Sequence, residues 1–311
     1  MNLIALLIGL VIERLATQLF HLRRLRWLDH IIDVGFAQAQ KLANWPALVL
    51  VILLALLLAL PVFVATLVLG TSYVLGDTLA GFPYMLLAIV VLFFSLGPQD
   101  IGEDVDDYCK ALEEGDADRI QQTAKAIVES EVPTGELERI HKVEEAVCVQ
   151  ANNRLFAVIF WFVLLGPLGA WTYRVTDLIR RRAVFTASRE NEADGSASQV
   201  RDAAVTLHGW LAFIPARLTA IGYATAGHFD AAIGAWRAPT EQKDASLSEY
   251  NEHLLARVGV SALALAGDAD EGEDLTQRGV RGAMAANKLV FRLLLIWAVI
   301  IAAMTLYGLT R

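Results

Sequence analysis

Long uncharged apolar runs alternate with polar, periodic stretches along this chain of 311 residues. Residues 46–69 and 289–309 are each long and apolar enough to cross a bilayer, which takes about 20 helical residues. Residues 84–96 form a shorter run. Residues 1–11 begin an apolar helix that lacks the basic start and cleavage site of a secretory signal peptide. The pattern predicts an all-α, polytopic membrane protein with about four transmembrane helices.

Residues 99–152 have the pattern of amphipathic helices in water. Ile120, Ala124 and Ile127 recur at spacings i, i+4 and i+7, which places them on one helical face. Charged residues occupy the faces between them. We therefore expect helices that pack on one side and meet water on the other.

Residues 176–287 are also helical in pattern, without the alternation of a strand. Within them, residues 207–226 form a semi-apolar stretch with Pro215 and Arg217 near its centre. A cation at the centre of a lipid-facing span is costly. We expect an interfacial or protein-covered helix there.

Residues 155–173 allow two interpretations. The run is long enough to cross a membrane, but the sequence Gly-Pro-Leu-Gly at 166–169 interrupts it, and arginines follow at 174 and 180–182. A full span would leave these arginines outside, against the rule that basic residues mark the cytoplasmic side. A re-entrant, broken helix would return them to the inside, and such breaks are tolerated where protein covers them. The sequence leaves both open.

These patterns divide the chain into five regions. The basic cluster at residues 21–26 lies close to an apolar segment, which predicts that the large polar loops are cytoplasmic. The regions are N-terminal membrane helices at 1–98, a cytoplasmic helical loop at 99–152, a membrane-embedded broken helix at 153–175, a cytoplasmic or interfacial helical region at 176–287, and a C-terminal transmembrane helix at 288–311.

Composition supports a membrane protein and limits the chemistry. The chain is 56% hydrophobic and 19% charged, whereas a soluble domain carries about 25% charged residues. The net charge of −8 excludes nucleic acid as a partner, because phosphate binding needs a basic face. Cys109 and Cys148 form no spaced pair, and neither a phosphate-binding loop nor a hydrolase motif is present. We expect no metal, no cofactor and no catalytic set.

The order of motifs resembles the AmpE family. The motifs are ERL at 13–15, the acidic helical loop, NNRLFAVIFWFVLLGPLGAWTYR at 152–174 and IPARLTAIGYATAGHFDAAIGAW at 214–236. Members of this family are inner-membrane proteins linked to regulation of chromosomal β-lactamase, and they are divergent relatives of the CobD/CbiB membrane enzymes of cobalamin synthesis. The resemblance implies a multi-pass, non-enzymatic regulatory or sensory protein of the bacterial inner membrane, linked to cell-wall status.

The synthase relatives differ from this chain at acidic positions. Their ENxxDG pattern corresponds to a stretch in which Asn152 is kept but Ala151 and Leu155 replace the acids, and their DDxxNxIPARL pattern has His208-Gly209 at the acidic pair. Carboxylates of this kind would hold Mg²⁺ in ATP-dependent amide formation. Their replacement argues against that reaction. The alternative is a membrane enzyme related to adenosylcobinamide-phosphate synthase, with an altered or lost active site.

Polar residues near the apolar segments are the candidates for a ligand site, because such groups need partners and are often functional. Arg217 would hold a small anionic or cell-wall-derived ligand, and His208 would be a pH-sensitive contact if it lies beside Asn152. The same residues also suit a packing role. Besides the lipid bilayer, we expect a protein partner or a second copy of the chain. The candidates are Asn152, Asn153, Arg154, Tyr173, His208 and Arg217.

Overall fold

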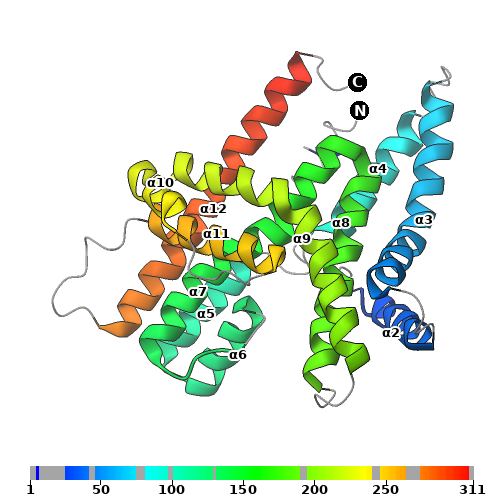
Figure 1. Ribbon diagram of the computed structural model, residues 1–311. Coiled ribbons are helices and arrows are strands. Elements are labelled where there is room, and N and C mark those ends of the chain that lie inside the picture. Colours follow the sequence, from blue (N-terminus) through cyan, green and yellow to red (C-terminus); the bar gives the residue numbers. More distant parts are fainter. Residues whose placement is uncertain are drawn as a thin grey trace.

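The computed structural model describes residues 5–6, 25–41, 46–74, 81–96, 101–128, 131–189, 195–239, 246–263 and 274–307. In these ranges the chain forms helices and no strand, which confirms the all-α prediction (Figure 1). The predicted first helix and the ERL motif lie almost wholly outside the described residues.

The described residues form eleven helices and one π-helical turn. In chain order they are α2 (Arg26–Lys41), α3 (Ala47–Val74), α4 (Gly81–Ser95), α5 (Ile101–Glu114), α6 (Ala117–Val128), α7 (Glu136–Ala151), the π-helical turn η3 (Asn152–Phe156), α8 (Ala157–Arg189), α9 (Gly195–Ala226), α10 (Phe229–Arg237), α11 (Leu247–Ala262) and α12 (Leu275–Leu306).

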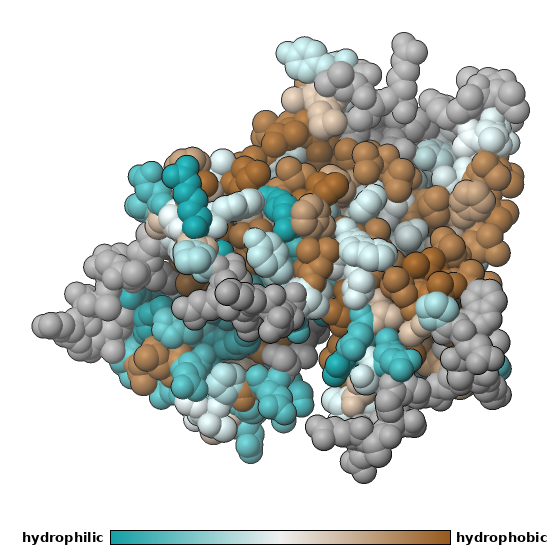
Figure 2. Space-filling view, in the orientation of Figure 1, coloured by the Kyte–Doolittle hydropathy of each residue, from teal (hydrophilic) through white to brown (hydrophobic). Residues whose placement is uncertain are grey.

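Apolar helices occupy one end of the molecule, where hydrophobic residues dominate the surface (Figure 2). Among the described residues, four helical segments are long and apolar enough to cross a membrane: Ala47–Ser72, Glu136–Ser188, Ser198–Ala226 and Leu275–Leu306. On α3, side chains such as Leu57 and Leu67 are more than half exposed. Exposed apolar surface on this scale is unfavourable in water and suits contact with lipid. The chain is a membrane protein.

The chain reverses direction inside α8. Gly166 has φ 65° and ψ −151°, outside the helical region, and Pro167 follows it. A Cβ on Gly169 would lie 2.3 Å from the carbonyl oxygen of Trp161, although eight residues of continuous helix would separate the two by about 12 Å. The two arms of α8 therefore lie antiparallel, as Figure 1 shows. Residues 155–173 turn back, as the re-entrant interpretation requires.

Helices α5, α6 and α7 pack with the end of α9, with α10, with α11 and with much of α12 around one core. Ile120, Ala124 and Ile127 are buried in this core, as their spacing predicts. Glu144 of α7 pairs with Arg278 of α12 and ties the core to the last helix. This core holds α7 and α11 beside the ends of the two α8 arms that lie away from the turn at Gly166.

Candidate functional site

The turn η3 places three consecutive polar residues inside the protein. The amide of Ala157 donates to the carbonyl oxygen of Asn152, which widens the helix by one residue per turn. Asn152, Asn153 and Arg154 are all at least 95% buried. Single π-helical turns of this kind are frequent at functional sites.

Asn152 and Asn153 bind each other and α9. Thr219 donates to Oδ1 of Asn152 at 3.0 Å, and Nδ2 of Asn152 donates to Oδ1 of Asn153 at 3.1 Å. Nδ2 of Asn153 is buried and has no hydrogen-bond partner within the described part of the chain. A buried donor without a partner costs about 1–3 kcal/mol and calls for an explanation such as a bound water or ligand.

Arg154 joins three helices. Its guanidinium donates to Oδ2 of Asp104 on α5 at 2.7 Å, to the carbonyl oxygen of Ala126 on α6 at 3.1 Å and to Oε1 of Gln150 on α7 at 3.1 Å. Removing one partner of such a buried pair leaves an uncompensated charge. The geometry gives Arg154 a supporting role rather than an open binding surface.

The arginines that follow the hairpin converge on one acid. Asp177 is fully buried and accepts hydrogen bonds from Arg174 at 3.1 Å, Arg180 at 2.9 Å and Arg181 at 2.8 Å. Arg180 also lies 3.5 Å from a carboxylate oxygen of Glu252 on α11. In the sequence these arginines indicated only sidedness, and the network that they form was not predicted.

His208 connects the hairpin to α11. One ring nitrogen lies 3.3 Å from the hydroxyl of Tyr173, and the other lies 3.3 Å from the hydroxyl of Ser248. Asp177 is 3.8 Å from the same ring. Among the described residues His208 and Asn152 share no hydrogen bond, and Asn152 is bound instead by Thr219.

Arg217 occupies a third, partly exposed position. One terminal nitrogen donates to the carbonyl oxygen of Phe213 at 2.7 Å and to Oδ1 of Asn251 at 2.8 Å. The guanidinium lies 3.4 Å from the centre of the Phe213 ring. The six candidates thus occupy three places, and the structure does not bring them together into one site.

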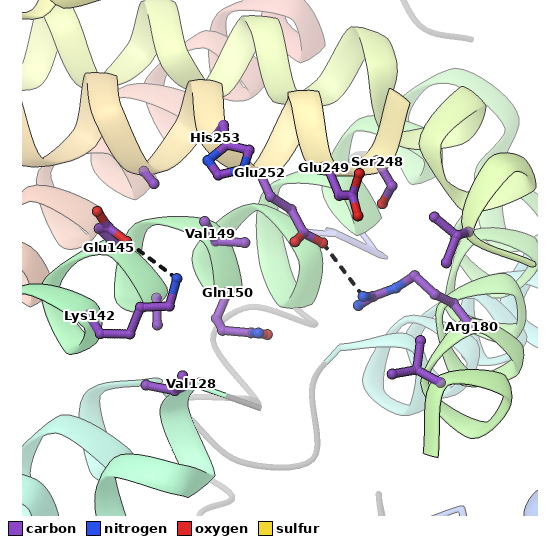
Figure 3. A pocket seen from close by; sticks show the side chains of 14 residues that line it. Val128, Lys142, Glu145, Val149, Gln150, Arg180, Ser248, Glu249, Glu252 and His253 are labelled. Carbon is purple, nitrogen blue, oxygen red and sulfur yellow. Dashed lines mark hydrogen bonds and ion pairs between the residues drawn. The ribbon is translucent and has the colours of Figure 1, made fainter. Parts of the chain in front are cut away.

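A cavity of about 420 Å³ lies between α6, α7, α8, α9 and α11. This volume falls within the range of small-molecule sites. Figure 3 shows Lys142, Glu145 and Gln150 on one side, and Glu252 directed toward Arg180 across the opening. Each side of the cavity carries both acidic and basic groups, which suits a ligand that has an acid and an amine.

Residues behind the cavity hold three of its wall residues. Arg154 binds Gln150, His208 binds Ser248, and Asp177 binds Arg180. Two of the predicted candidates therefore position the cavity wall without lining it themselves. The sequence contains a signal for the cavity wall in the polar faces of α7 and α11. A single sequence does not show, however, that helices a hundred residues apart face each other.

The described residues offer no group of three or more His, Cys, Asp or Glu side chains placed to hold a metal ion. Two acidic residues of the cavity instead pair with cations, Glu145 with Lys142 at 3.4 Å and Glu252 with Arg180 at 3.5 Å, and Glu249 accepts a hydrogen bond from the backbone nitrogen of Ser246 at the start of α11. These side chains present charged and hydrogen-bonding groups to the cavity.

A helical hairpin beside a polar cavity, in a bundle with several bilayer-length apolar helices, defines a polytopic α-helical membrane protein. The family described as regulatory signalling modulator protein AmpE matches residues 1–310, and the chain belongs to the AmpE family.

Two curated relatives with similar sequences are named as cobalamin biosynthesis proteins. The cobalamin biosynthesis protein CobD of Stutzerimonas stutzeri strain A1501 is 25% identical over 217 residues, which cover 68% of this chain and 69% of the relative. The protein of the same name from Chromobacterium violaceum is 27% identical over 161 residues, covering 50% of this chain and 49% of the relative. The match therefore spans about half of the second relative. No solved structure matches.

Proposed function

We propose that this protein is a non-enzymatic regulator in the bacterial inner membrane, of the AmpE type, that responds to cell-wall status and affects β-lactamase induction. Membership of a family of regulatory signalling modulators supports this function. The observation that carries it is the buried network that links the cavity to the hairpin through Arg180 and His208.

The network suggests how a ligand would act. Arg180 contacts Glu252 at the cavity and Asp177 within α8. A ligand with an amine would compete for Glu252 and release Arg180, which changes the charge balance at the foot of the hairpin. Packed interfaces convert such local changes into discrete shifts. The ligand class we propose is a small molecule that has an amine and an acid, as cell-wall peptides do.

Packing around Gly209 argues against a synthase site. A Cβ at this position would lie 2.8 Å from the backbone nitrogen of Ser248, closer than real Cβ atoms approach. His208, at the other acidic position of the synthases, is buried and bound to Tyr173 and Ser248. An acid at position 209 would require α9 and α11 to move apart, and an acid at position 208 would replace the contacts of His208 with Tyr173 and Ser248.

Deletion and complementation test the proposal. In a strain that lacks this gene, we expect the β-lactamase induction curve against increasing β-lactam to shift, and the wild-type gene to restore it. An unchanged curve after deletion would remove the link to β-lactamase, and would leave the cavity as a ligand site of another regulatory path.

The alternative function is that of an amide-forming membrane enzyme in which the residues that bind the metal ion differ from those of the synthases. Its support is the 25–27% identity to CobD proteins and the retained Asn152 and Ile-Pro-Ala-Arg-Leu segment. An enzyme of this kind would bind Mg-ATP. A thermal-shift titration of the purified protein with Mg-ATP separates the two proposals, because the regulator predicts no nucleotide-dependent rise in Tm.

A further inference from the structure

An exposed apolar stripe runs along α9. Trp210, Phe213, Ile214, Leu218 and Ile221 are 39–51% exposed. Their positions follow i, i+3, i+4, i+8 and i+11, which places them on one helical face. The opposite face of α9 is buried against α8, α11 and α12. The stripe is therefore directed away from the protein, and an uncovered surface of this kind suits acyl chains.

Arg217 lies within this stripe, at position i+7 from Trp210. Its hydrogen-bond acceptors are the carbonyl oxygen of Phe213 and the amide oxygen of Asn251, and both are neutral. No described residue provides a carboxylate within ion-pair distance of Arg217. By contrast, Arg182 pairs with Asp33 and Arg154 pairs with Asp104. Arg217 is a cation in apolar surroundings without an anion from the described protein.

The guanidinium is fixed in place before any ligand binds. It stacks at 3.4 Å over the ring of Phe213 and lies 5.6 Å from the ring of Tyr250. Asn251, its hydrogen-bond partner, donates to the carbonyl oxygen of Gly209 at 3.0 Å and is thereby held itself. A planar, preoriented guanidinium with free donors matches the geometry of a phosphate group.

We propose that Arg217 binds the phosphate of an anionic phospholipid, with Asn251 and Tyr250 beside it and the acyl chains along the stripe. A lone cation in a lipid-facing stripe is costly unless it reaches an anion at the membrane boundary, and the phospholipid headgroup supplies that anion. The partly exposed Tyr250 fits the same boundary, where aromatic residues gather. This site is separate from the cavity and does not depend on the proposed regulatory function.

Lipid preference in nanodiscs tests this site. We expect the full-length protein to retain phosphatidylglycerol over phosphatidylcholine when measured by native mass spectrometry. Arg217→Gln should lower this preference about fivefold to tenfold, the range for one cation at an anionic surface or one charge-assisted hydrogen bond. Arg217→Lys should keep part of it. Arg201→Gln is the matched control, because Arg201 lies on the same helix but already pairs with Asp202 at 2.9 Å.

Three results would overturn the proposal. The first is an equal phosphatidylglycerol preference in wild type and Arg217→Gln. The second is stabilisation of the detergent-solubilised protein by inorganic phosphate or glycerol phosphate to the same extent as by the lipid, which would indicate a site for a free anion. The third is a loss of dimer in Arg217→Gln with no change in lipid preference, which would assign the stripe to a second copy. Should Arg217→Gln not fold, a wild-type protein without any phosphatidylglycerol preference would also contradict the proposal.

Discussion

Gly209 limits how closely α9 and α11 can approach. An added Cβ would lie 2.8 Å from the nitrogen of Ser248, so we expect Gly209→Ala to lower the free energy of unfolding by about 1–3 kcal/mol. Gly234, in α10, is the control because a Cβ there meets nothing within 4 Å. Denaturant unfolding in detergent measures both variants. Equal stability of the two would show that α9 and α11 are not in close contact at this point.

Burial makes the thiol of Cys109 unreactive. Cys109 is 7% exposed, and its burial, with Asp106 and Glu113 nearby, raises the pKa of the thiol to about 11. Thiolate is the reactive form, and near pH 8 roughly one thiol in a thousand would be ionised. In a Cys148→Ala background, maleimide should label Cys109 slowly until the protein unfolds. Lys110→Cys, at an exposed position of the same helix, gives the fast reference rate, and matching rates would contradict the burial.

At the scale of elements, the hairpin in α8 depends on a backbone conformation that suits glycine. Gly166 has φ 65° and ψ −151°, a region in which side chains cost about 1–3 kcal/mol. We expect Gly166→Ala to destabilise the protein by that amount. Gly70→Ala, in the helical α3 where a Cβ makes only ordinary contact with Tyr84, should be neutral or stabilising. A neutral Gly166→Ala would argue for a straight helix.

How far the elements follow from the sequence depends on local signals. The apolar run of α3 and the spacing of Ile120, Ala124 and Ile127 predicted their helices correctly, because period and length are local properties. Gly166 and Pro167 indicated a break but left its direction open, since reversal depends on packing between the arms. Residues 198–226 proved long and apolar enough for a span by composition, although Pro215 and Arg217 had suggested otherwise.

At the scale of the whole molecule, the reversal returns the chain to the side on which α7 begins. We therefore expect cysteines introduced at the exposed positions Glu138 and Ser198 to lie on the same side of the membrane. An impermeant maleimide should label both variants only after spheroplasts are permeabilised, because the positive-inside rule predicts a cytoplasmic position for both. Opposite accessibility of the two cysteines would show that residues 155–173 cross completely.

The cavity depends on how the whole molecule is arranged, and it was not predicted from the sequence. Glu252 and Arg180 lie 72 positions apart, and Gln150 is on a third helix, so only the tertiary arrangement brings them together. Arg154 and His208, which lie behind the cavity wall, could be predicted as candidates because isolated polar residues near apolar runs are recognisable in a sequence. Wall residues in ordinary amphipathic helices, such as Lys142 and Glu145, have no such signal.

The most direct test of the regulatory account is an induction curve for a cavity variant. The strain that lacks this gene would be complemented with wild type, Glu252→Gln or the control Asp230→Asn, which alters an exposed acid on α10 outside the cavity. Comparable membrane levels of the three proteins would be checked by immunoblot. We predict that wild type and Asp230→Asn restore the β-lactamase induction curve and that Glu252→Gln does not. Full restoration by Glu252→Gln would contradict a regulator that acts through this cavity.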